Sequence, residues 1–61
     1  MRLLIEKKLI GSIQRISCID EDTGTEVVFQ APKYASDKEI EGLALLKMKY
    51  IIEKNKGKIG G

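Results

Sequence analysis

The sequence contains no histidine and no tryptophan, and it has one cysteine and one proline. A disulfide framework needs paired cysteines, and a zinc site needs several histidine or cysteine ligands, so both are excluded. Without histidine, the serine and threonine hydroxyls lack the usual base that activates a nucleophile. We therefore expect no enzyme: no catalytic residue, no metal, no cofactor and no small-molecule substrate.

Long apolar runs are also missing. No run approaches the ~18 residues that a membrane-spanning helix requires. The apolar start of the chain is broken by the charges at 6–8 (Glu-Lys-Lys), which is not typical of a signal peptide. The lone Cys18 is typical of a reducing compartment. These features predict a cytoplasmic protein that does not contact a membrane.

The apolar residues that are present suffice for one small domain. Leu, Ile, Val and Phe make up 18 of the 61 residues, which is above the ~20% typical of disordered chains. A chain of this length is near the lower size limit for folding alone. We expect a single domain at 1–55, a flexible tail at 56–61, and added stability from a second copy or a partner.

Two segments have the alternating pattern of strands. Residues 12–20 and 25–31 predict a β-hairpin over 12–31, because Gly24 can adopt positive φ in the turn between them. Pro32 ends the second strand because it has no N–H to donate. Residues 2–10 fit either a third strand or an amphipathic helical turn, and the β-branched residues that follow favour the strand.

A helix is predicted over about 37–54. Ser36 and Glu39 have the spacing of a capping box, in which each side chain bonds the backbone N–H of the other. The fold class is then α+β, a two- or three-stranded antiparallel sheet with one C-terminal helix packed on one face. We expect a core between sheet and helix formed by Ile16, Cys18, Val27, Phe29, Ile40, Leu43, Ala44 and Ile51. In that core, Cys18 is a small buried side chain rather than a reactive thiol.

The predicted helix has more apolar surface than a small sheet can cover. Its apolar arc spans about 220°, whereas packing on one sheet requires about 100°. The surplus predicts a protein interface, with either a second copy in a homodimer or a different protein. Its candidate residues are Gly42, Leu45, Leu46, Met48 and Ile52. Gly42 costs about 1 kcal/mol relative to alanine inside a helix, so it is either a tolerated surface glycine or a point of close backbone approach.

Charge is distributed unevenly along the chain. Residues 1–15 carry a net charge of +3, residues 16–46 carry −5, and residues 47–61 carry +4. The basic ends suggest an alternative function, a small nucleic-acid-binding module that uses Lys and Arg from both ends. Its candidate contacts on the helix are Lys47, Lys54 and Lys58. No strand interleaves aromatic and basic residues as an RNA-stacking sheet does, which favours protein contact.

The acidic stretch at 20–26 is similar in spacing to the opening of a calcium loop. The third Asp or Asn before the glycine and the closing bidentate Glu are absent, however. A solvated hairpin tip without metal is therefore expected.

The order of hairpin, Pro32, crossing segment and helix capped by Ser36 resembles two kinds of protein. One is the small β-β-β-α unit at the front of tyrosine recombinases, which grips DNA with its sheet. The other is the short phage-encoded protein that binds and redirects a host enzyme. The resemblance is one of architecture and transfers no residue. It implies a regulatory protein of viral or mobile-element type that binds a larger host protein.

Overall fold

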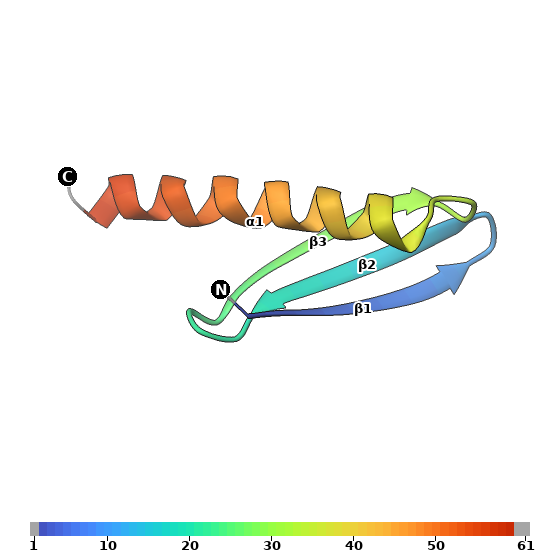
Figure 1. Ribbon diagram of the computed structural model, residues 1–61, viewed down its shortest axis with the longest axis horizontal. Helices are drawn as coiled ribbons and strands as arrows, with labels where there is room; N and C mark the ends of the chain where they lie inside the picture. Colours follow the sequence, from blue (N-terminus) through green and yellow to red (C-terminus); the bar gives the residue numbers. More distant parts are fainter. Residues whose placement is uncertain (1, 60–61) are drawn as a thin grey trace.

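The computed structural model describes the backbone of residues 2–59 and the side chains of residues 2–55. It confirms the α+β class: a three-stranded antiparallel sheet is followed by one helix that lies along one face of it (Figure 1). The third strand settles the alternatives for residues 2–10. The elements are β1 (Leu3–Ile10), β2 (Ile13–Asp20), β3 (Thr25–Pro32) and α1 (Asp37–Ile59), and the strand order in the sheet is β1-β2-β3.

Both turns of the sheet depend on a glycine with positive φ. Gly11 and Ser12 connect β1 to β2, with a φ of +60° at Gly11 and a negative φ at Ser12, as a type II′ turn requires. Gly24 closes the turn between β2 and β3 with a φ of +76°, and its N–H donates to the carbonyl of Asp20 at 2.7 Å. The predicted hairpin is therefore confirmed, together with the role of its glycine.

The core lies between the sheet and a narrow stripe of α1. The helix contributes Ile40, Ala44 and Met48, which follow one another at intervals of four residues and are at most 1% exposed. On the sheet side, β2 and β3 present alternate residues to this stripe, as pleated strands do. The buried sheet residues are Ile16 and Ala31 against Ile40, and Cys18 against Ala44 and Met48.

For two helix residues, the environment predicted from the sequence is wrong. Met48 was expected at an interface, but its side chain is completely buried in the core. Leu43 was expected in the core, but it is 42% exposed. The reason is that an apolar arc of about 220° does not indicate which part of it faces the sheet. The orientation of the helix on the sheet decides that.

The start of α1 is held from two sides. The N–H of Glu39 donates to Ser36 Oγ at 3.1 Å and the N–H of Ser36 donates to Glu39 Oε1 at 3.2 Å, which confirms the capping box. From β2, Gln14 Nε2 donates to the carbonyl oxygen of Pro32 at the end of β3 (3.1 Å) and to those of Lys33 (3.1 Å) and Ala35 (3.2 Å) in the crossing segment. The crossing segment between β3 and α1 is therefore bonded to the central strand.

The far end of α1 extends beyond the predicted end at Lys54. Its backbone continues to Ile59. The expected tail at 56–61 lies outside the residues whose side chains the structure describes.

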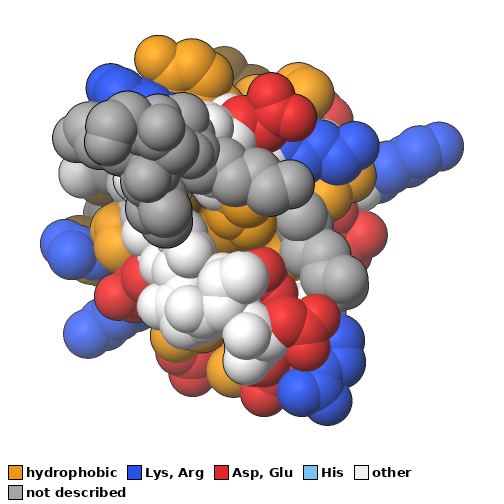
Figure 2. Space-filling model, turned by 90° about the vertical axis from the view of Figure 1, so that its left-hand side faces the viewer, with side chains coloured by type: hydrophobic (Ala, Val, Ile, Leu, Met, Phe, Trp, Pro, Cys, Tyr) orange, Lys and Arg blue, Asp and Glu red, His pale blue; other side chains and the backbone are white. Residues whose placement is uncertain are grey.

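Asp20 organises the opposite end of the sheet, next to the β2–β3 turn. The residue is 1% exposed, and its carboxylate accepts from Thr23 Oγ1 (2.9 Å) and from the backbone N–H groups of Asp22 (3.1 Å) and Arg2 (3.3 Å). Burial raises the pKa of Asp20, but these hydrogen bonds outweigh burial and hold the pKa below its ordinary value. Seen from this end, both acidic and basic side chains lie around an uncharged surface (Figure 2).

Candidate functional site: a groove between α1 and β3

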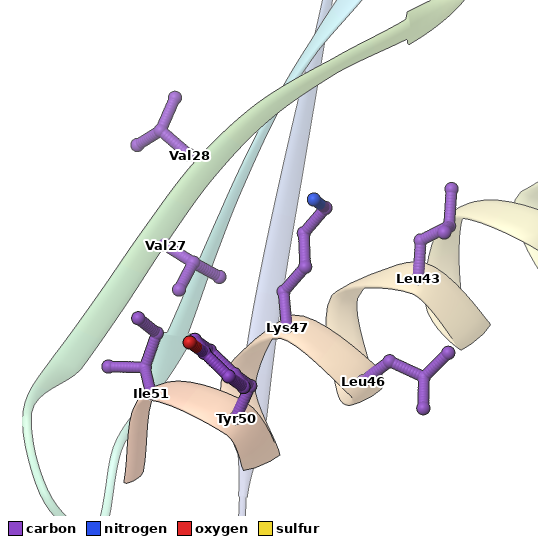
Figure 3. A pocket seen from close by; sticks show the side chains of 7 residues that line it. All are labelled: Val27, Val28, Leu43, Leu46, Lys47, Tyr50 and Ile51. Carbon is purple, nitrogen blue, oxygen red and sulfur yellow. The ribbon is translucent and has the colours of Figure 1, made fainter. Parts of the chain in front are cut away.

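A groove of about 550 Å³ runs between β3 and the flank of α1 nearest to it. Figure 3 shows its walls, which come from one strand and about two turns of the helix. Six of the seven lining side chains are apolar or aromatic. The lining residues are Val27, Val28, Leu43, Leu46, Lys47, Tyr50 and Ile51.

The strand wall is formed by two consecutive valines. Val27 points towards α1 and packs against the core cluster that contains Met48, while Val28 lies on the other side of the strand (Figure 3). Val28 is 49% exposed because it points to the face of the sheet that α1 does not cover, opposite to Val27. β3 is also the last strand of the sheet. The groove therefore opens onto the free edge of the sheet.

The helix wall is an apolar row formed by Leu43, Leu46 and Tyr50. Their spacings of three and four residues place them on one flank of α1. Leu46 and Tyr50 remain 67% and 65% exposed, which are large fractions for side chains of this size. We refer to Leu43, Leu46 and Tyr50 as the outer row, which belongs, with Leu45, to the part of the apolar arc that the sheet does not cover.

Lys47 lines the groove and Lys54 lies beside Tyr50, another of its lining residues, so each lysine is near an aromatic ring. Lys47 Nζ is 5.3 Å from the centroid of the Phe29 ring, and Lys54 Nζ is 5.9 Å from that of Tyr50. At these distances an ammonium is attracted by the face of the ring. The groove thus combines an apolar floor with a basic rim.

The structure distributes the predicted interface residues over different environments. Leu46 lies in the groove, whereas Gly42 is exposed with no neighbour within 4 Å of where a Cβ would be. Leu45 is 38% exposed, and Ile52 packs against the cluster of Cys18, Ala44 and Met48. Sequence reasoning missed the contributions of Leu43, Tyr50 and the valines of β3. The spacing of Leu43, Leu46 and Tyr50 was the available signal.

The predicted nucleic-acid contacts do not gather into one basic surface with the start of the chain. Lys47 and Lys54 lie along the groove, and the side chain of Lys58 is outside the described residues. Lys8 and Arg15 pair across β1 and β2. They point away from α1, because Ile16, next to Arg15, points towards it.

Chemistry outside the groove is limited. Burial, and secondarily the charge of Asp20, raises the pKa of the Cys18 thiol, which makes this residue an unreactive part of the core. Within residues 2–55, no three His, Cys, Asp or Glu side chains are grouped so as to hold a metal ion. The one helix that the structure describes is not long and apolar enough to cross a membrane.

The fold and the groove define a class of small α+β domain in which one helix covers only part of a three-stranded sheet. A family model described as "Domain of unknown function (DUF6898)" matches residues 2–55, and the chain belongs to this family. The match includes all three strands and most of α1. No curated protein and no solved structure matches the chain.

Proposed function

We propose that this protein is a small non-enzymatic binding protein that acts through protein–protein contact, and that the groove between α1 and β3 is its contact surface. The observation that supports this most strongly is the exposure of the outer row next to the two valines of β3. Large contiguous apolar patches on soluble proteins are usually interaction sites. Leucine and tyrosine at such a site provide contact area that becomes favourable once water is excluded.

The surrounding charges support protein contact over nucleic-acid contact. A nucleic-acid surface concentrates Lys and Arg so that several phosphates are neutralised together. Here Lys47 and Lys54 flank an apolar groove, while Arg15 and Lys8 lie on the other face of the sheet. The proposal includes a regulatory role in the cytoplasm, and the buried thiol of Cys18 supports a reducing compartment.

The test compares two charge substitutions on α1. Leu46→Glu places a charge in the groove, and Lys49→Glu changes an exposed residue outside its lining. Each variant and the unmodified chain are immobilised and used to capture proteins from nuclease-treated extract of the native cell. Tagged copies of the chain are added to the extract so that self-association is detected as well. We expect Leu46→Glu to lose at least one protein that Lys49→Glu retains, with both variants folded by circular dichroism.

Equal capture by the two variants would contradict the groove as the contact surface. A nuclease-sensitive capture, together with a salt-dependent shift of duplex or single-stranded nucleic acid, would support the alternative function instead.

A further inference from the structure

We infer that the groove is occupied by a second copy of the chain, and that the two copies join through antiparallel pairing of β3 with the β3 of the other copy. The sheet then continues from one copy into the next, and the outer rows of the two helices face each other. This inference rests on the proposed function and specifies its partner. Three observations support it: the composition of the sheet edges, the position of α1, and the charges along α1.

The two edges of the sheet differ in their protection against pairing. β1 carries three consecutive charges in its middle, Glu6, Lys7 and Lys8. Charged residues on an edge strand discourage another strand from adding there. β3 has the uncharged sequence Val27-Val28-Phe29 in its middle. β3 carries one charge, Glu26, and ends at Pro32, so it is the less protected edge, and the groove runs along it.

The position of α1 matches what such a pairing requires. Antiparallel pairing of identical strands places a two-fold axis perpendicular to the sheet, so both helices lie on the same face and run antiparallel. α1 packs mainly on β3 and β2, while Leu3 and Ile5 of β1 lie at the margin of its core. The two helices are then separated by two strand spacings, about 10 Å, from a strand spacing of about 4.8 Å. Packed helices lie 8–10 Å apart, so the outer rows can fill the space between them.

The charges along α1 are complementary in this arrangement. The first turn of the helix is net acidic, with Asp37 and Glu39 on either side of Lys38, whereas Lys47 and Lys54 lie further along it. Asp37 also pairs with Lys7 of β1 in the same chain. Antiparallel helices bring the acidic start of each copy next to the lysines of the other. Parallel helices would place like charges side by side, which is unfavourable.

Spin labels on the two sheet edges test the inference. Val28→Cys places a label on the β3 edge, and Lys8→Cys places one on the β1 edge. Cys18 is buried, and the unmodified chain serves as the control for its labelling. Self-association is first established by sedimentation equilibrium over micromolar concentrations, and inter-label distances are then measured by electron paramagnetic resonance. Gln30→Cys provides a second label on β3 in case the first one disturbs the pairing.

In the paired dimer, the backbone positions of Val28 in the two copies lie within about 15 Å, even with a stagger of four residues at about 3.4 Å each. The positions of Lys8 are separated by five strand spacings, at least about 24 Å. A short distance for the β3 labels and a long one for the β1 label supports the inference. A dimer in which the β3 labels are far apart overturns it, and so does a folded monomer at every concentration. If Leu46→Glu still abolishes capture of another protein in those two cases, the proposed function stands without the inference.

Discussion

The two rows of α1 are both largely apolar, but they differ in environment. Ile40, Ala44 and Met48 are buried completely or almost completely, whereas Leu46 and Tyr50 of the outer row are about two-thirds exposed. Both rows consist of residues that favour helix or burial, so composition does not distinguish them. The width of the sheet does, because three strands provide a surface for one row and leave the other at the edge. The extent of a small sheet thus decides which apolar residues form the core and which are left for contact.

The largest effect expected from this comparison is on stability. Met48→Ala removes a fully buried side chain, and we expect it to lower the free energy of unfolding by about 2–5 kcal/mol. Leu46→Ala, in the outer row, is expected to change it by no more than about 0.5 kcal/mol in dilute solution. Urea denaturation at a concentration below self-association measures both values. Similar losses for the two variants would show that the rows do not differ in burial.

The next effect is on stability at low pH, and it compares the buried Asp20 with the exposed carboxylates of the same turn. Because the pKa of Asp20 is lowered in the folded protein, its contribution to stability is present above the unfolded-state pKa of 3.8 and is lost as the pH falls through the lower folded value. We expect unfolding midpoints to fall in this range, and Asp20→Asn to lower stability at neutral pH and weaken the acid dependence. Glu21→Gln, which removes an exposed carboxylate from the same turn, is the matched control. An unchanged acid profile in Asp20→Asn would contradict this role.

A smaller effect is expected at the start of α1, before either row begins. Ser36→Ala removes the acceptor for the Glu39 N–H, and we expect a loss of about 1 kcal/mol, within the range of 0.5–2 typical of such caps. Ser36→Asp, which retains an acceptor, should recover most of it. Denaturation curves that superimpose on that of the unmodified protein would mean that packing of the buried row alone fixes where the helix starts.

The smallest effect is a gain in stability. Gly42 lies outside both rows, and nothing lies within 4 Å of where a Cβ would be. Gly42→Ala should stabilise the protein by up to about 1 kcal/mol, because alanine favours the helix. We expect self-association to be unchanged in this variant. A weakened dimer in sedimentation would instead place Gly42 at a close contact between copies, as the sequence alone suggested.

Local signals in the sequence were enough for the elements, and they were not enough for their assembly. Gly24, Pro32 and the pair Ser36–Glu39 act on residues near them, so the hairpin and the helix start were predictable. The direction in which Met48 points was not, because it depends on how α1 is rotated on the sheet. The groove depends further on which strand lies at the edge beside the helix. The spacing of apolar residues within α1 does not indicate which strand will lie beside the helix.

The side chain of Gln14 has a consequence for the order of folding. It extends from the central strand to three carbonyl oxygens of the segment that leads into α1. A slip of β2 by one position in its pairing would turn this side chain to the other face of the sheet. The three carbonyls would then lose their donor, and the helix would lack its attachment. We therefore expect the hydrogen bonds of Gln14 to favour docking of α1 on a hairpin whose strands are paired in the native register.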